Sequence, residues 1–231
     1  MISRLRKSLR ARGVVATLRL ARRRLSGAAA RLADRHFDWA FGTDTRTMVE
    51  NTDLRDVQSS NLARGIRYEP TLAIPFRRAL RAARVPSHGT FVDIGCGKGR
   101  ACMLAVVHGF DDVTGVDYSP GLCRVAERNL DLLRARTNRR FTSSIRAMDA
   151  ADYAFAPGDT VVYLFNPFDA GVLSAVMARL RRSLATHPRE VWIVYQNPLW
   201  REAVETGRDF AHVGDRTYGG CDFAVYRSRS A

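Results

Sequence analysis

Most of the chain after residue 70 alternates between short apolar runs and longer segments whose apolar residues recur every three or four positions. Short apolar runs are typical of buried strands, and the three-to-four spacing is typical of helices that bury one face. Turn residues at 218–220 sit between two further short apolar runs and predict a closing hairpin. We predict strands at 90–94, 113–118, 143–148, 160–165 and 191–196, helices at 72–84, 100–108, 119–136 and 170–184, and hairpin strands at 211–214 and 223–227.

Strands that alternate with helices and are apolar throughout indicate a parallel sheet covered by helices on both faces. With the closing hairpin added, we expect an α/β fold, a doubly wound seven-stranded mixed sheet whose last strand is antiparallel. Residues 61–231 would form this domain. Residues 1–60 would form an N-terminal helical extension, namely a basic arm and a connector.

The arm carries most of the excess charge of a chain whose formal net charge is +14. Residues 1–31 hold ten basic residues and no acid, so the other 200 residues contribute 27 positive and 23 negative charges, or +4. Apolar residues at Val14, Leu18, Ala21 and Leu25 define one helix face. We favour packing of this face on the chain's own domain. The alternative is weak contact of residues 1–31 with an anionic surface such as lipid or RNA.

The spacing of the cysteines indicates whether the chain binds a metal, and the length of its apolar runs indicates whether it spans a membrane. The four cysteines lack C-x-x-C spacing and have no histidines at metal-ligand intervals. No run approaches the roughly eighteen apolar residues that a membrane span needs. We expect reduced thiols, no metal and a cytoplasmic location, with peripheral binding at the inner membrane as an option that the arm leaves open.

A glycine-rich loop follows the first predicted strand, with Gly95, Gly97 and Gly99 placed just after Asp93. Glycines let the backbone turn sharply and let a ligand approach without a Cβ in the way. The helix N-terminus that follows favours an anionic group. A dinucleotide fingerprint would place glycine or alanine three residues after Gly97, where this chain has Arg100. The spacing therefore favours a nucleoside cofactor that is not a dinucleotide.

Two further acids follow the next two predicted strands. Asp117 ends the second strand, 22 residues after Gly95, where a carboxylate can accept both hydroxyls of a ribose. Tyr118 beside it offers a ring face to a purine. Asp149 follows the third strand, where it can accept from an adenine amino group, although acids in this position are also ordinary helix caps.

These residues resemble the cofactor-binding motifs of class I S-adenosylmethionine-dependent methyltransferases over about residues 68–227. The resemblance implies a Rossmann-like methyltransferase fold with S-adenosylmethionine as the cofactor. It also implies that the loop glycines accommodate the methionyl part of the cofactor, that Asp117 binds the ribose and that Asp149 binds the adenine.

The segment Tyr68-Glu-Pro-Thr71 resembles a Tyr-x-Pro-Ser/Thr element that precedes the glycine loop in lysine-directed methyltransferases and in uncharacterised bacterial relatives. Residues 37–45 are similar to the same relatives. The resemblance implies that Tyr68 and the Thr71 hydroxyl close over the methionyl end of the cofactor. A plain helix start, with Thr71 as its N-cap, is the alternative.

The fourth predicted strand ends in Asn166-Pro167-Phe168, at the sheet edge where a doubly wound fold binds ligands. This segment resembles the Asn/Asp-Pro-Pro-aromatic motif of nitrogen methyltransferases, shortened by one proline. The resemblance implies that Asn166 and Pro167 accept the N–H bonds of the acceptor and that Phe168 stacks on it. Asn-Pro is also a common turn opener, as at Asn197-Pro198.

The leading prediction is an enzyme that transfers a methyl group to nitrogen, with a protein side chain as the first candidate acceptor. A lysine acceptor would have to lose a proton to water or to a carboxylate such as Asp169. The alternatives are an RNA or small-molecule methyltransferase and a non-catalytic nucleoside-binding scaffold. Since one fold hosts many substrates, the acceptor stays unidentified at this stage.

Overall fold

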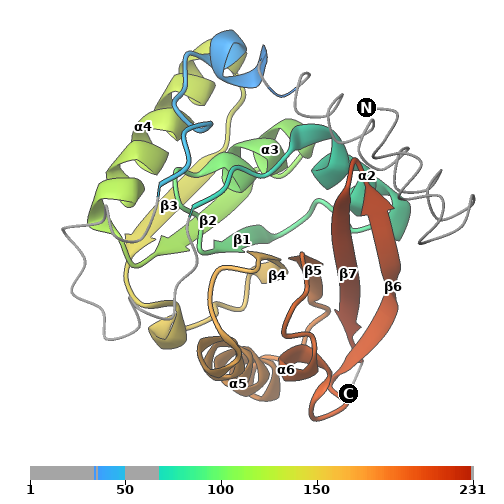
Figure 1. Cartoon of the computed structure of the whole chain (residues 1–231). Helices are drawn as coiled ribbons and strands as arrows, with labels where there is room; N and C mark the ends of the chain where they lie inside the picture. Colours follow the sequence, from blue (N-terminus) through green and yellow to red (C-terminus); the bar gives the residue numbers. More distant parts are fainter. Residues whose placement is uncertain (1–33, 35, 50–67, 230–231) are drawn as a thin grey trace, which may run out of the picture.

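The computed structural model describes Asp34, residues 36–49 and residues 68–229. The predictions for the basic arm concern residues 1–31 and lie outside the described residues. The described part of the chain forms one twisted sheet between two layers of helices (Figure 1).

The sheet has seven strands in the order β3-β2-β1-β4-β5-β7-β6. Strands β1 to β5 run parallel to one another, and β7 pairs antiparallel with both β5 and β6. This confirms the predicted doubly wound, seven-stranded mixed sheet. The strands are β1 (Thr90–Ile94), β2 (Asp112–Asp117), β3 (Thr142–Ala147), β4 (Asp159–Phe165), β5 (Trp192–Gln196), β6 (Phe210–Tyr218) and β7 (Cys221–Ser228).

The predicted helices lie within two residues of the observed ones, whereas the closing hairpin is longer than predicted. Its strands β6 and β7 extend to the turn at 219–220, because they continue to pair beyond the apolar runs that marked them. The four-residue helix α6 was not predicted. The helical elements are α2 (Ala73–Ala83), α3 (Arg100–His108), α4 (Pro120–Thr137), η3 (a 3-10 turn, Ala150–Asp152), α5 (Ala170–Thr186) and α6 (Glu202–Glu205).

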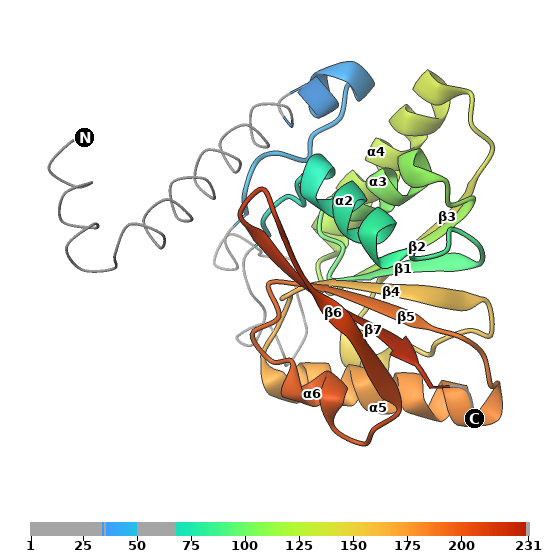
Figure 2. The same ribbon diagram turned by 90° about the vertical axis from the view of Figure 1, so that its right-hand side faces the viewer.

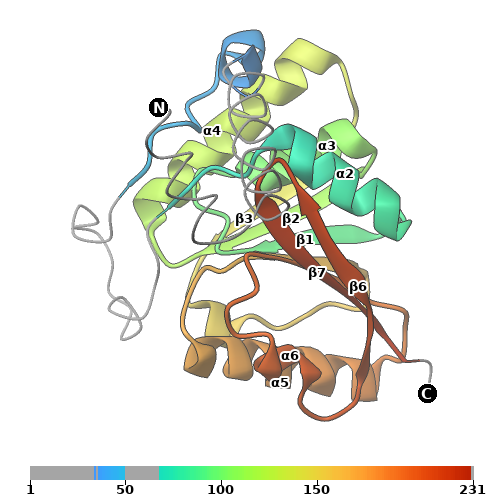
Figure 3. The same ribbon diagram turned by 45° about the vertical axis from the view of Figure 1, so that its right-hand side comes forward.

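Each face of the sheet carries its own apolar core. Helices α2, α3 and α4 cover one face, and α5, α6 and η3 cover the other (Figure 2). Neighbouring residues of β1 show the division, since Phe91 packs in the first core and Val92 in the second. Burial on both faces explains why the central strands are apolar throughout. The β6–β7 hairpin closes one edge of the sheet (Figure 3).

The sheet changes direction between β1 and β4. These strands are neighbours, yet the chain leads from β1 outward to β2 and from β4 outward to β5. Such a switch point leaves a crevice at the carboxyl ends of the strands, where ligands bind in doubly wound folds. The glycine loop after β1, Asp117 at the end of β2 and Asn166 after β4 all lie at this edge.

Candidate active site

One cavity opens at the carboxyl ends of β1, β2 and β4. Every predicted site residue lines it except Gly99 and Asp149. The topology thus brings together segments that are far apart in the sequence. The predicted residues in the wall are Tyr68, Thr71, Asp93, Gly95, Gly97, Asp117, Tyr118, Asn166, Pro167 and Phe168.

The glycine loop is covered closely by two of these residues. A Cβ built on Gly97 would lie 2.0 Å from Cδ2 of Tyr68, and one on Gly95 would lie 2.4 Å from Cβ of Pro167. Both glycines also have positive φ angles, +50° and +84°. A side chain at either position would therefore be strained and would displace the cavity wall.

Gly99 and Asp149 have structural contacts outside the cavity. A Cβ on Gly99 would lie 2.9 Å from Cβ of Ala126, so its absence lets α3 approach α4. Asp149 is the N-cap of η3, and its Oδ1 accepts from the backbone N–H of Ala151 at 2.9 Å. Ala150, the next residue, does line the cavity. The predicted cofactor contacts of Gly99 and Asp149 stay predictions.

Asp117 is buried and held by backbone amides. Its Oδ2 accepts from Gly97 N at 2.8 Å, and its Oδ1 accepts from Ser119 N at 2.9 Å. These two amide bonds orient the carboxylate, which offers about four acceptor sites in all. Its position suits the two hydroxyls of a ribose.

Asp93 is a second buried carboxyl group in the wall. Burial, and then the nearby charge of Asp117, raise the pKa of Asp93 from 3.8 to about 8. The thiol of Cys102 lies 3.9 Å from its Oδ2 and donates to it. Asp93 therefore holds its proton at neutral pH, and a cationic group bound in the cavity would favour the ionised form.

A buried hydrogen-bonded chain joins Thr71 to the sheet. Thr71 Oγ1 lies 3.1 Å from the hydroxyl of Tyr163, which donates to Oε1 of Gln196 at 2.6 Å. The alternative in which Thr71 caps α2 is wrong, because Leu72 occupies the N-cap position. The N–H of Ala73 bonds instead to the carboxylate of Asp34 at 3.0 Å, a contact that only the tertiary structure creates.

Asn166 is buried and has a left-handed backbone, with φ +41°. Asparagine tolerates this conformation better than other residues with a side chain. Its Oδ1 accepts from the hydroxyl of Tyr195 at 3.2 Å. Asn197, after β5, has φ +52° and also lines the cavity, so the second Asn-Pro turn belongs to the site as well. Phe168 lines the cavity and packs in the second core.

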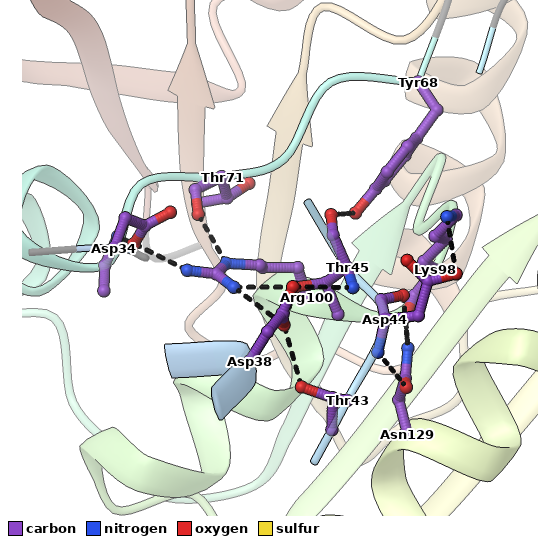
Figure 4. Close-up of polar contacts among 11 residues, drawn as sticks. Asp34, Asp38, Thr43, Asp44, Thr45, Tyr68, Thr71, Lys98, Arg100 and Asn129 are labelled. Carbon is purple, nitrogen blue, oxygen red and sulfur yellow. Dashed lines mark hydrogen bonds and ion pairs between the residues drawn. The ribbon is translucent and has the colours of Figure 1, made fainter. Parts of the chain in front are cut away.

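Arg100 is a site residue that the sequence reasoning missed. Its side chain is 1% exposed and lines the cavity at the start of α3. Its Nε donates to the carbonyl of Thr71 at 3.0 Å, and its Nη2 forms an ion pair with Asp34 at 2.6 Å (Figure 4). Its Nη1 donates to Oγ1 of Thr45 at 2.6 Å. The resemblance in residues 37–45 was the one sequence signal in this part of the site.

The residues present fit S-adenosylmethionine. The loop provides backbone without side chains, Asp117 offers acceptors for a ribose, and Leu122, Ala150 and Tyr118 provide apolar surface near it for a base. Asp93 offers a buried carboxyl group for an ammonium. Among the described residues, no group of three or more His, Cys, Asp or Glu could hold a metal ion, and no helix is long and apolar enough to cross a membrane.

This sheet order, glycine loop and acid at the end of β2 define a class I S-adenosylmethionine-dependent methyltransferase domain. Comparison with known proteins agrees, since residues 91–187 match the family described as a methyltransferase domain. Residues 91–187 therefore lie in a methyltransferase domain, and the cofactor that fits its cavity is S-adenosylmethionine.

The individual proteins that the chain resembles share at most 26% sequence identity with it in the three comparisons given next. The curated EEF1A lysine methyltransferase 2 of Mus musculus is 26% identical over 98 residues, which cover 42% of this chain and 36% of the relative. The chain thus matches about a third of that relative's length. A structure from work on the conversion of a disulfide bond into a thioacetal group during echinomycin biosynthesis has a TM-score of 0.51 at 16% identity, covering 67% of this chain and 80% of that one. An RNA methyltransferase from Salinibacter ruber in complex with S-adenosyl-L-homocysteine has a TM-score of 0.49 at 19% identity, covering 68% and 91%.

Proposed function

We propose that the protein transfers a methyl group from S-adenosylmethionine to a nitrogen atom of a protein side chain. The observation that carries the proposal is the buried Asn166 carboxamide, which lines the same cavity as Asp93 and Asp117. When bound, the cofactor supplies an electrophilic methyl group on its sulfonium. The protein's part is to hold and orient the acceptor nitrogen.

The Asn166 carboxamide is oriented for that task. Its Oδ1 already accepts one hydrogen bond, from Tyr195, and a carbonyl oxygen can accept a second from the N–H of an acceptor. An amine bound in this way directs its lone pair away from the carboxamide. The backbone carbonyl of Pro167, next along the cavity wall, is the second candidate acceptor of an N–H bond.

The charge of the cavity favours an amine. Although the chain is strongly basic, the described residues of the cavity wall include two acids, Glu69 and Asp117, besides Asp93, which keeps its proton until a cationic group binds. Arg100 is the one cationic residue among the described residues of the wall, and its charge is compensated by Asp34 and Asp38. Such a site attracts an ammonium and repels a phosphate. This supports a protein amine over RNA.

Glu69 replaces Asp169 as the candidate for proton removal. Asp169 is the N-cap of α5, and its Oδ1 accepts from the N–H groups of Gly171 and Val172. Glu69 is exposed and lines the cavity, so its carboxylate can bind an incoming ammonium and accept its proton. The relative named as a lysine methyltransferase supports the same acceptor type.

The test is transfer of label from tritiated S-adenosylmethionine to the protein, RNA and small-molecule fractions of a lysate. The matched control is Asn166→Gly, because glycine accepts the left-handed backbone and lacks the carboxamide. We expect label in the protein fraction with the wild type, and at least about tenfold less with the variant. Both proteins should bind S-adenosylhomocysteine equally in calorimetry.

Other outcomes separate the alternatives. Label in the RNA or small-molecule fraction would overturn the protein acceptor and identify RNA or a small molecule as the substrate class. Binding of S-adenosylhomocysteine with label in no fraction would favour the non-catalytic scaffold. Amino-acid analysis of a labelled protein must find the methyl group on nitrogen, and label on oxygen or sulfur would overturn the proposed chemistry.

A further inference from the structure

The segment that precedes the sheet, Asp34 and residues 36–49, is called the strap here. It contacts the start of α3 through a buried ionic cluster (Figure 4). Arg100 pairs with Asp34 at 2.6 Å and with Asp38 at 3.4 Å. The ring of Phe37 lies 4.2 Å from the guanidinium carbon. A buried cation is costly unless it is paired, so Arg100 and the strap depend on each other.

The cluster fixes Thr45. The Thr45 hydroxyl accepts from Arg100 Nη1 at 2.6 Å and donates to Oδ1 of Asp38 at 2.6 Å. The backbone N–H of Thr45 donates to Oδ2 of Asp38 at 3.1 Å. Thr43 donates a further hydrogen bond to Asp38, at 2.8 Å. Thr45 is thus held from both sides.

Thr45 in turn holds Tyr68. The hydroxyl of Tyr68 donates to the carbonyl of Thr45 at 2.7 Å, and the backbones of Val49 and Tyr68 pair as an antiparallel bridge. The ring of Tyr68 lies on Gly97, where no side chain would fit. A continuous series of hydrogen bonds therefore joins Arg100, through Thr45, to the ring that covers the glycine loop.

A second set of contacts ties the strap to the loop itself. Lys98 pairs with Asp44 at 2.9 Å. The side-chain amide of Asn129, on α4, donates to the carbonyls of Asp44 and Lys98 at 3.1 and 2.9 Å. Its Oδ1 accepts from the N–H of Asp44 at 3.1 Å. The strap is therefore bound at both Lys98 and Arg100, on the two sides of Gly99.

We propose that Arg100 and Asp38 are positioning residues that set cofactor affinity by holding Tyr68 over the glycine loop through Thr45. The inference rests on the cavity being the cofactor site. It adds that the strap is part of that site, although it precedes the sheet in the sequence. Because coupling is reciprocal, a ligand bound under Tyr68 should stabilise the strap.

The experiment is calorimetry of S-adenosylhomocysteine with the full chain and the variants Tyr68→Phe, Asp38→Asn and their double. Each substitution removes one link and keeps nearly the same shape. We expect the Kd to rise about three- to tenfold in each single variant. In the double variant the Kd should be no higher than in Tyr68→Phe alone, because Asp38 acts through the tyrosine hydroxyl.

Tyr153→Phe is the matched control. Its hydroxyl donates to Asp159 at 3.0 Å in the second core, away from the cavity wall. We expect this variant to melt at a lower temperature but to keep the wild-type Kd, which separates stability from affinity. Hydrogen exchange of residues 36–49 should slow when S-adenosylhomocysteine binds the wild type, and slow much less in Tyr68→Phe.

The outcomes are distinguishable. A wild-type Kd in both single variants would overturn the positioning role while leaving the proposed function intact. If Asp38→Asn raises the Kd by the same factor in the wild type and in Tyr68→Phe, Asp38 acts on cofactor affinity by a route other than the tyrosine hydroxyl. Failure of the wild type to bind S-adenosylhomocysteine would overturn the cofactor site and the inference together.

Discussion

The hydroxyl of Tyr195 donates a hydrogen bond of 3.2 Å to the carboxamide oxygen of Asn166. Tyr195 lies in β5 and Asn166 directly follows β4, the neighbouring parallel strand, so the two residues meet at the carboxyl edge of the sheet. The bond fixes the direction in which the Asn166 carboxamide faces the cavity. It also makes Tyr195 a residue whose role can be separated from cofactor binding.

Tyr195→Phe should lower kcat about tenfold and change the Kd of S-adenosylhomocysteine by less than about twofold. The reason is that the variant releases the Asn166 carboxamide without touching the glycine loop or Asp117. Steady-state kinetics on the labelled acceptor and calorimetry measure the two effects. Tyr226→Phe, which removes a hydroxyl bonded to Glu205 instead, serves as the control and should keep its kcat.

Asp93 predicts a pH dependence of stability. Its pKa is about 8 in the fold against 3.8 ordinarily, so above pH 4 the unfolded chain releases this proton while the folded protein keeps it. The free energy of unfolding contributed by this group therefore falls as pH rises from about 4 to 8. In urea denaturation at pH 5 and pH 8, wild type should lose about 4 kcal/mol relative to Asp93→Asn. A constant difference between the two proteins would contradict the raised pKa.

The same group predicts a pH dependence of binding. An ammonium near Asp93 favours its ionised form, so binding of S-adenosylhomocysteine should release a proton below pH 8. Affinity should then rise with pH up to about 8. Calorimetry in two buffers of different ionisation enthalpy counts the released proton, and Asp93→Asn should release fewer protons than wild type.

Two glycines of the loop should respond differently to alanine. In Gly97→Ala the new Cβ would collide with Tyr68 in the cavity wall, so binding of S-adenosylhomocysteine should weaken at least about tenfold. In Gly99→Ala it would meet Ala126 instead, and the φ of +78° adds strain. We expect a stability loss of about 1–3 kcal/mol with a much smaller change in Kd. Equal losses of affinity would place Gly99 in the cofactor site.

Asp149→Ser tests the predicted adenine contact. Serine is also a good N-cap, so the 3-10 turn η3 should be retained and the melting temperature should change little. The shorter side chain cannot reach a base, and we expect the Kd of S-adenosylhomocysteine to rise about fivefold. If calorimetry gives the wild-type Kd, the predicted adenine contact of Asp149 is wrong.

The sequence by itself determined most elements of the sheet, and it placed the glycine loop and Asp117 at the edge where the cavity opens. The closing hairpin was predicted too short, and α6 was not predicted. The strands β1 to β5 and the four longer helices were predictable to within two residues, because the spacing of buried residues along the chain depends only on the type of the element. The glycine loop and Asp117 were predictable for a similar reason. Each depends on a particular residue type at the end of one strand, which can be recognised in the sequence. The loop after β1 and the end of β2 are then joined directly, because Gly97 N donates to the Asp117 carboxylate.

Only the tertiary structure decided which residues complete the site. In the sequence, Arg100 was interpreted only as the residue that excludes a dinucleotide fingerprint. In the structure it pairs with Asp38, 62 positions earlier. Thr71 was predicted as a helix cap or a cofactor contact, but its hydroxyl bonds to the hydroxyl of Tyr163. The first amide of α2 donates instead to the carboxylate of Asp34. Such pairs leave no periodic signal. Their free energy comes from removing both partners from water together, and only the folded chain specifies which partners those are.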